Sequence, residues 1–129
     1  MYKVLIADDH PLFRAALSVA LNGIDEDIAL IESGDFNATQ EQLTRLDIDL
    51  LLLDLKMPDN EGLLGLIKLR SRFPQVAIVV ISATEDPKII NEVRASGALA
   101  YIIKSTPLEE MQSIISSVLK GNSHFPQWV

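Results

Sequence analysis

Five polar residues of this 129-residue chain stand directly after short apolar runs: Asp8, Asp9, Asp54, Ser82 and Lys104. The runs that precede them are Val4–Ala7, Leu50–Leu53, Val76–Ile81 and Ala98–Ile103. If these runs are parallel strands of one open sheet, their carboxyl ends lie along a single edge, where such sheets place their binding sites. Three carboxylates, a hydroxyl and an ammonium would then share one pocket.

This set of side chains predicts phosphoryl chemistry at a metal site. Two carboxylates about 4 Å apart repel each other by roughly 4 kcal/mol at an effective dielectric constant near 20, so three acids together favour a bound cation. Mg²⁺ prefers carboxylate, carbonyl and water oxygens and often binds beside phosphate oxygens. With Lys104 and Ser82 to hold a phosphoryl group, Asp54 is the candidate nucleophile, which would form an acyl phosphate.

Each of these residues also has an ordinary structural interpretation. Asp8 and Asp9 could cap the helix that follows them, because carboxylates are favourable at the positive end of a helix dipole. Asp54 could be a loop acid, Lys104 a solvated charge and Ser82 a turn residue. Their joint occurrence at successive strand ends, rather than any single residue, favours the metal and phosphoryl site.

Strands that alternate with helices must position these residues, and such alternation is typical of a parallel sheet. Strands are expected at 3–7, 28–32, 50–53, 76–81 and 99–103. Helices are expected from residue 11 onward and at 37–46, 62–73, 88–96 and 108–120. The strand at 28–32 is polar enough for an edge, whereas 50–53 is apolar on both faces, as a covered central strand must be.

Proline and glycine mark the expected helix ends. A proline at the first helical position follows a capping residue at three helix starts: Asp9 or His10 before Pro11, Asp86 before Pro87 and Thr106 before Pro107. Gly97 and Gly121 follow the last two helices, where a glycine commonly stops the helix.

Composition limits the class of protein. With 48% hydrophobic and 22% charged residues, the chain is that of one globular domain. Its 11 basic and 18 acidic residues give a net charge of −7 without a basic cluster, which argues against direct binding of nucleic acid. The lack of cysteine fits a reducing cytoplasm, and no apolar run approaches the roughly 20 residues of a membrane helix.

Four motifs occur in order, one at each chemically interesting strand end. They are Val4-Leu5-Ile6-Ala7-Asp8-Asp9-His10-Pro11, Leu53-Asp54-Leu55-Lys56-Met57-Pro58 with Gly62, Ile81-Ser82-Ala83, and Tyr101-Ile102-Ile103-Lys104. Together they resemble the receiver domain of two-component response regulators over about residues 2–121. Three further segments look like the NarL/FixJ (LuxR-type) branch: Asp9–Arg14, Lys104–Pro107 and the closing Gly121…Phe125-Pro126.

The resemblance implies a flavodoxin-like (βα)5 fold, a three-layer sandwich with five parallel strands in the order 2-1-3-4-5. It also implies that a sensor histidine kinase phosphorylates Asp54 in a Mg²⁺-dependent reaction. The metal would be held by three carboxylates and one backbone carbonyl, those of Asp8, Asp9, Asp54 and Lys56. The chain would catalyse its own phosphorylation and dephosphorylation, and we do not expect a turnover enzyme in the usual sense.

The same resemblance assigns a switch. Ser82 and Lys104 would bind the phosphoryl oxygens, and Tyr101 would turn inward as Ser82 moves. Side chains beside the pocket, those of Lys56 and Thr84, would set the lifetime of the phosphoryl group. Many receivers have a cis proline after the lysine; here Ser105 follows it, and because a cis bond without proline costs about 3 kcal/mol we expect a trans bond.

Members of the LuxR-type branch usually carry a helix-turn-helix DNA-binding domain after a linker. We therefore expect residues 1–121 to be the receiver domain and 122–129 to be a tail or the start of such a linker, with transcription controlled through a domain outside these residues. Two alternatives are a stand-alone or inert receiver that serves as an interaction module, and an aspartyl-nucleophile phosphatase. Phosphatases of the haloacid-dehalogenase type place their nucleophile after the first strand, whereas Asp54 follows the third.

Two helices carry more apolar residues than one sheet contact needs. The helix from residue 11 has one apolar side made of Phe13, Leu17, Ala20 and Ile24, and another made of Leu12, Ala15 and Val19. The helix at 108–120 has an apolar stripe of Leu108, Met111, Ile114, Ile115, Val118 and Leu119. The surplus is either tolerated surface or the interface of a homodimer through these two helices.

Overall fold

The computed structural model describes residues 1–24, 27–60 and 62–128. Within these residues strands and helices alternate along the chain, as the sequence predicts. The elements are β1 (Tyr2–Ala7), α1 (Pro11–Asn22), β2 (Ile28–Ser33), α2 (Phe36–Arg45), β3 (Leu50–Leu53), α3 (Leu63–Arg72), β4 (Ala77–Ser82), α4 (Pro87–Ala95), β5 (Ala100–Ile103) and α5 (Leu108–Leu119). None of these helices has the length and apolar character that crossing a membrane requires.

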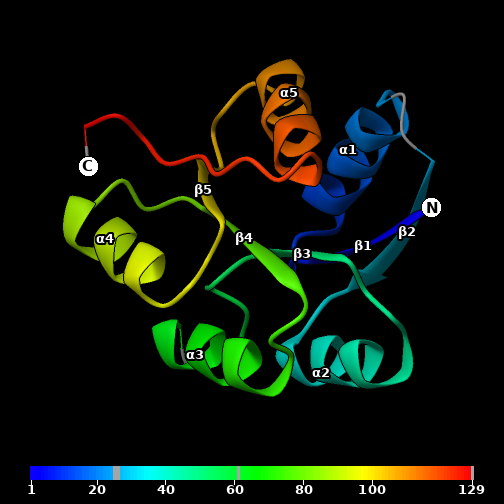
Figure 1. Cartoon of the computed structure of the whole chain (residues 1–129), viewed down its shortest axis with the longest axis horizontal. Coiled ribbons are helices and arrows are strands. Elements are labelled where there is room, and N and C mark those ends of the chain that lie inside the picture. Colours follow the sequence, from blue (N-terminus) through cyan, green and yellow to red (C-terminus); the bar gives the residue numbers. More distant parts are fainter. Residues whose placement is uncertain (25–26, 61, 129) are drawn as a thin grey trace.

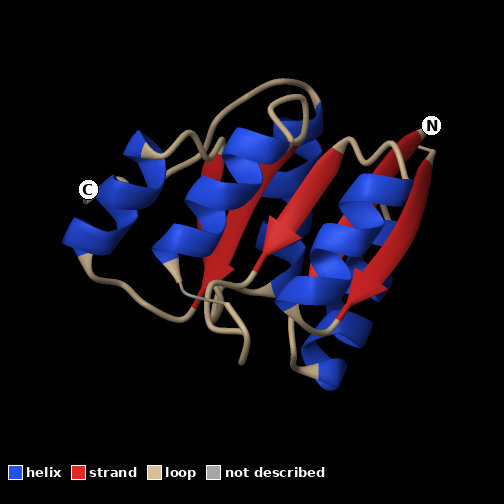
Figure 2. Cartoon of the chain, turned by 90° about the horizontal axis from the view of Figure 1, so that it is seen from below, coloured by secondary structure: helices blue, strands red, loops and turns tan. Residues whose placement is uncertain are grey.

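The strands form one parallel five-stranded sheet in the order β2-β1-β3-β4-β5, which confirms the predicted topology. Figure 2 shows the strand arrows running in a common direction between layers of helices. The strand at 28–33 lies at one edge, as its polar residues predict, and β3 lies in the centre. All four residues of β3 are buried, as expected for a strand covered by helices on both faces.

Successive residues of each strand enter two different cores. In β3, Leu50 and Leu52 pack with α1 and α5, whereas Leu51 and Leu53 pack with α2, α3 and α4. Figure 1 shows this division, with α1 and α5 on one side of the strands and the other three helices on the opposite side. The three-layer sandwich therefore follows from the two-residue period of a strand whose positions are all apolar.

Helix ends follow the sequence signals with two exceptions. Asp86 caps α4 by accepting the N–H of Lys88 at 3.0 Å, and the glycines at 97 and 121 have φ of +95° and +96°, the left-handed conformation of a helix stop. His10 occupies the cap position of α1, but its side chain makes no capping bond. Pro107 is itself the cap residue of α5 rather than its first helical residue. The described peptide bonds are trans, including the bond after Lys104.

Two carboxylates cap the amino end of α2. Asp35 accepts the N–H of Ala38 at 2.7 Å. Asp59, which lies in the loop after β3, accepts the N–H groups of Phe36 and Asn37 at 2.6 and 3.1 Å. These bonds satisfy backbone donors that an α-helix leaves free at its amino end. They also fix the loop that follows β3 on a helix from another part of the chain.

The tail segment at 121–128, which follows α5, docks on the sheet, and Val129 lies outside the described residues. Its backbone runs beside β5, where the N–H of Tyr101 donates to the carbonyl of His124 at 2.8 Å. The guanidinium of Arg94 in α4 lies 4.2 Å from the centre of the Phe125 ring. The tail therefore contacts both β5 and α4.

Replacing Asp59 by alanine should lower the free energy of unfolding by about 1 kcal/mol near neutral pH, because α2 loses a capping acceptor. The backbone N–H of Phe36, aided by that of Asn37, holds the pKa of Asp59 below its usual value of 3.8 despite some desolvation. This stabilisation is therefore present above pH 3.8 and is lost as the pH falls through the lowered folded pKa. Urea unfolding at neutral and acidic pH measures it. Asp47→Ala, at an exposed loop acid, is the control; equal losses in both variants would contradict the capping role.

Candidate functional site

Adjacent central strands bring the three acids together. Asp8 and Asp9 follow β1, and Asp54 follows β3, whose last residue, Leu53, is in register with Ala7. The N–H of Asp54 donates to the carbonyl of Ala7 at 2.9 Å, which continues the ladder by one residue. The carboxyl ends of two paired strands therefore place these carboxylates side by side, at the edge where the sequence predicts them.

The hydroxyl and the ammonium reach the same edge from β4 and β5. Ser82 is the last residue of β4 and is in register with Ile103 at the end of β5. The N–H of Lys104 donates to the carbonyl of Ser82 at 2.8 Å, so the backbones of these two residues are in direct contact. All five residues singled out in the sequence thus lie at one end of the sheet.

Lys104 is the cation that holds the acids together. Its Nζ lies 2.8 Å from Oδ2 of Asp8 and 3.3 Å from Oδ2 of Asp54, and both of these acidic side chains are only 3% exposed. The ring of Phe13 lies below the ammonium, 4.7 Å away. Burial by itself would lower the pKa of Lys104, but the two carboxylates outweigh burial and raise that pKa above its usual value of 10.5. The lysine is therefore a fixed positive charge in this form of the site.

The carboxylate of Asp54 is held at both oxygens. Oδ1 accepts the backbone N–H of Lys56 at 3.0 Å, and Oδ2 faces the ammonium of Lys104. The side chain of Lys56 itself is exposed. Contacts at both oxygens restrict the rotation of the carboxylate, which is the preorganisation that a nucleophile needs.

The donor set fits a divalent cation. Oδ1 of Asp9 is buried and finds no hydrogen-bond partner among the described residues, although its side chain is 26% exposed overall. One ligand atom from each of Asp8, Asp9, His10 and Asp54 lies within 4.8 Å of all the others. A buried carboxylate oxygen that makes no hydrogen bond, beside two further acids, is an arrangement that a hard cation can satisfy.

Ser82, Thr84 and Tyr101 form a connected group beside the acids. Ser82 is buried, and its Oγ accepts the N–H of Thr84 at 3.4 Å. The hydroxyl of Tyr101 donates to the carbonyl of Thr84 at 2.8 Å. Burial raises the pKa of Tyr101; a hydrogen bond with Ser82 opposes this, and the charge of Asp54 adds to it. The ring of Tyr101 is fully buried.

Sequence reasoning missed His10 as a member of this site. Its Nδ1 lies 3.0 Å from Oδ1 of Asp8 and 2.9 Å from Nζ of Lys104, although the sequence indicates only a capping candidate for α1. The available signal was its place between two acids and Pro11. Arg14 was also missed; its guanidinium donates to the carbonyl of Asp8 and pairs with Glu32 at 3.0 Å.

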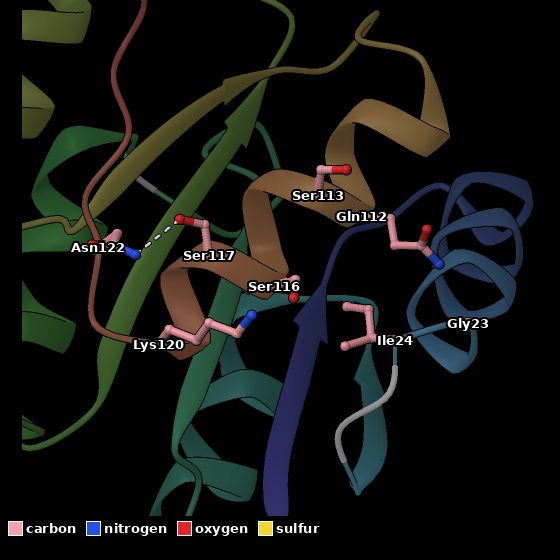
Figure 3. Close-up of a pocket in the computed structure, with 8 residues that line it drawn as sticks. All are labelled: Gly23, Ile24, Gln112, Ser113, Ser116, Ser117, Lys120 and Asn122. Carbon is pink, nitrogen blue, oxygen red and sulfur yellow. Dashed lines mark hydrogen bonds between the residues drawn. The ribbon is translucent and has the colours of Figure 1, made fainter.

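One groove of the structure is remote from this chemistry. A groove of about 540 Å³ lies between the carboxyl end of α1 and α5, and Figure 3 shows the side chains that line it. Among the described residues that line it, Lys120 alone is charged, and Asn122 donates to Oγ of Ser117 at 3.1 Å. None of the clustered acids faces it, so we place the functional site at the strand ends.

Comparison with known proteins identifies relatives of this chain. The family model of the response regulator receiver domain matches residues 4–116. The chain is 39% identical over 127 residues to the glycerol metabolism activator of Pseudomonas putida, a match that covers 98% of this chain and 58% of that protein. The chain thus spans less than two thirds of the length of the curated relatives that it matches.

Solved structures with the same fold include regulators that bind DNA. The isolated receiver domain of RcsB from Salmonella enterica serovar Typhimurium, solved with phosphomimetic BeF3⁻, has a TM-score of 0.89 and 25% identity and covers 98% of this chain and 94% of its own. A LuxR family DNA-binding response regulator from Silicibacter pomeroyi has a TM-score of 0.88, 26% identity and full coverage of both chains. Another structure, of two RcsB dimers bound to two parallel DNAs, has a TM-score of 0.89 and 25% identity and covers 98% of this chain and 64% of its own.

The free energy of unfolding should fall at alkaline pH because of two groups of the site, Tyr101 and Lys104. The folded state raises the pKa of Tyr101 above 10.0 and that of Lys104 above 10.5, so it binds protons more tightly than the unfolded state does. The resulting stabilisation is complete below these unfolded values and is lost as the pH rises through the folded ones.

Tyr101→Phe should therefore show a smaller loss of unfolding free energy between about pH 9 and pH 11 than the unaltered protein. Near neutral pH the variant should be about 1 kcal/mol less stable, because the bond to Thr84 is lost. Tyr2→Phe, at the other tyrosine, is the matched control. Denaturant titrations across this pH range measure both effects, and parallel pH curves for Tyr101→Phe and the unaltered protein would contradict the assignment.

Proposed function

The chain belongs to the response regulator receiver domain family, and from that premise we propose that Asp54 accepts a phosphoryl group from a sensor histidine kinase. The supporting observation is the environment of this carboxylate. It is almost fully buried, held at one oxygen by the N–H of Lys56 and at the other by the ammonium of Lys104, and placed beside two further acids. A receiver domain of a response regulator needs an acceptor of this kind.

In the proposed transfer, an oxygen of Asp54 attacks the phosphorus of a phosphohistidine on the kinase. The new P–O bond forms as the P–N bond breaks, and the imidazole leaves with the electron pair. Bound Mg²⁺ would neutralise charge on the phosphoryl oxygens. Asp8, Asp9, Asp54 and the backbone carbonyl of Lys56 would hold it. Hydrolysis of the acyl phosphate by water returns the carboxylate.

Lys104 would change partners when the phosphoryl group arrives. Its Nζ, now between Asp8 and Asp54, would turn to a phosphoryl oxygen, because that group adds roughly −1.5 to −2 of charge. Oγ of Ser82 would bind a second phosphoryl oxygen and draw the loop after β4 toward Asp54. Lys104, Ser82 and Asp54, the groups that would change partners, all lie at the same end of the sheet.

The loop after β4 would carry this change outward. The N–H of Thr84 loses its acceptor when Ser82 moves, and the carbonyl of Thr84 holds the hydroxyl of Tyr101. A small shift at Ser82 therefore reaches β5 through two hydrogen bonds. For this path to act as a switch, the loop after β4 and β5 need two conformations whose free energies differ by only a few kcal/mol. The side chains of Lys56, which is exposed, and Thr84, which is half-buried, would set how readily water reaches the phosphoryl group.

We extend the proposal to partners and output. The chain would act in the cytoplasm and control transcription through a helix-turn-helix domain outside these residues, in line with relatives whose names state activation and DNA binding. A homodimer through α1 and α5 is supported by the exposure of Leu12 and Val19, which are 87% and 73% exposed on α1. Apolar side chains in such positions are typical of an interaction surface when they gather on one face.

Asp54→Asn should abolish the Mg²⁺-dependent gain of one phosphoryl group from acetyl phosphate, because the amide cannot form the acyl phosphate. Intact-protein mass spectrometry measures the gain. Asp47→Asn changes an exposed acid after α2 and should be phosphorylated like the unaltered protein. Incorporation that survives in Asp54→Asn would refute the acceptor assignment. No incorporation in the unaltered chain would support an inert receiver, and multiple turnover on phosphomonoesters would support a phosphatase.

Val19→Asp should reduce dimer formation in the presence of beryllofluoride by at least about tenfold in dissociation constant, because a charge is placed in an apolar contact. Light scattering with and without beryllofluoride measures the mass. Leu64→Asp, at a 55% exposed leucine of α3, is the matched control and should leave the dimer intact. A monomer under both conditions, or equal effects of both substitutions, would contradict an interface through α1 and α5.

A further inference from the structure

A single peptide group in the loop after β3 holds the carboxylate of Asp54. It joins Leu55 to Lys56, and its N–H donates to Oδ1 of Asp54 at 3.0 Å. Its carbonyl accepts a hydrogen bond from the side-chain amide of Asn60 at 2.9 Å. Because a trans peptide group is planar, its N–H and C=O point in opposite directions, and a bond at one end restricts the direction of the other. Asn60 is therefore connected to the carboxylate of Asp54 through one rigid group.

The amide of Asn60 has one orientation in this loop. A carbonyl oxygen accepts hydrogen bonds and cannot donate them, so the carbonyl of Leu55 must face Nδ2 of Asn60. The other end of the amide, Oδ1, is buried and makes no hydrogen bond with a described residue. The backbone N–H of Asn60 donates to the carbonyl of Met57 at 3.0 Å, which closes the loop on itself. Both the backbone and the side chain of Asn60 therefore hold this loop.

Gly65 leaves the space that this amide occupies. The glycine is buried near the start of α3, and a Cβ at its position would lie 1.7 Å from Oδ1 and 2.8 Å from Cγ of Asn60. The same Cβ would lie 3.0 Å from Cε1 of Phe36. A methyl group at this position would therefore displace the Asn60 amide and press on the Phe36 ring. Glycine is unfavourable inside a helix, and here the amide of Asn60 fills the place of the missing side chain.

The residue before Asn60 attaches the same loop to another helix. Asp59 accepts the N–H groups of Phe36 and Asn37 at the start of α2. Asp59 is thus held on α2, and the amide of Asn60 lies against α3. These two contacts restrict the movement of Asn60 relative to the sheet, so its bond to the peptide group after Leu55 is made from a fixed position.

We propose that Asn60 is a positioning residue for phosphoryl transfer to Asp54, and that Gly65 leaves the space that Asn60 needs. Asn60 acts through the peptide group after Leu55, whose N–H it keeps directed at Oδ1 of Asp54. This inference rests on Asp54 being the acceptor of the proposed function. Loss of the Asn60 bond leaves the carboxylate able to react but less well oriented, so it lowers the rate of transfer more than the binding of the phosphoryl donor.

Asn60→Leu keeps the branched shape of the side chain and removes the donor. With acetyl phosphate and excess Mg²⁺, the maximal rate of phosphoryl incorporation, followed by intact-protein mass spectrometry, should fall by about tenfold. The acetyl phosphate concentration that gives half of this rate should change little. In NMR spectra the N–H of Lys56 should shift and exchange faster with solvent, because its bond to the carboxylate weakens. Asn91→Leu, at an exposed asparagine of α4, is the matched control and should leave the rate and the Lys56 signal unchanged.

Gly65→Ala tests the space beside the amide. Alone, it should slow incorporation as Asn60→Leu does, because the methyl group displaces the amide. In a protein that already carries Asn60→Ala, the same substitution should slow incorporation no further. It should instead raise the free energy of unfolding, because alanine is the better helix former once the amide is absent. Denaturant titrations measure this change of sign, and circular dichroism checks that each variant is folded.

The outcomes separate this inference from the proposed function. If Asn60→Leu takes up the phosphoryl group at the rate of the unaltered protein, Asn60 does not position Asp54, and the acceptor assignment stands. An unchanged Lys56 signal in Asn60→Leu would overturn the inference in the same way. Equal slowing by Gly65→Ala with and without Asn60→Ala would show that the glycine does not act through Asn60. If the unaltered chain takes up no phosphoryl group, the proposed function fails, and the positioning role fails with it.

Discussion

Charge balance at the carboxyl edge of the sheet is the constraint on which the rest of the structure depends. Three carboxylates face one ammonium, and two like charges about 4 Å apart repel by roughly 4 kcal/mol even at an effective dielectric constant near 20. Lys104 bridges Asp8 and Asp54 and relieves part of this repulsion, while Oδ1 of Asp9 makes no hydrogen bond with a described residue. One ammonium cannot balance three carboxylates, and a bound divalent cation would offset the negative charge that remains.

Much of this arrangement follows from the sequence because parallel strands obey a simple geometry. The run at 50–53 is apolar at every position, which can only be satisfied between two helical layers, and the structure places β3 there at the predicted bounds. Once the strands are parallel, residues that follow them must meet at one edge. The meeting of Asp8, Asp54, Ser82 and Lys104 is therefore a consequence of topology rather than of any specific contact. The predicted ends of the elements differ from the observed ends by about one residue. For example, the N–H of Val76 donates to the carbonyl of Phe73, and β4 begins at Ala77.

The features that sequence reasoning missed are side-chain choices between residues far apart in the chain. His10 and Lys104 are 94 positions apart, and the ring of His10 contacts the acids and makes no capping bond to α1. The capping of α2 by Asp59 likewise joins two loops separated by more than 20 residues. Neither contact is marked by a periodic pattern of residue types in the sequence. Both contacts depend on side-chain rotamers, and that of Asp59 depends also on the donors left free at the start of α2. They can be recognised only once the positions of the loops in three dimensions are known.

The docked tail has a consequence for the sheet as a whole. A strand at the border of a sheet presents unpaired N–H and C=O groups that can recruit another chain. Beside β5 this border is occupied by the tail, whose His124 carbonyl takes the N–H of Tyr101 and whose Phe125 lies against Arg94. The border at β2 is instead lined by residues that are mostly half-exposed, with Glu32 among them, and charge there disfavours pairing with another strand. The two edge strands are therefore protected in different ways, β5 by the backbone of the tail and β2 by charge. Loss of the tail would leave β5 open to the addition of a strand from another molecule.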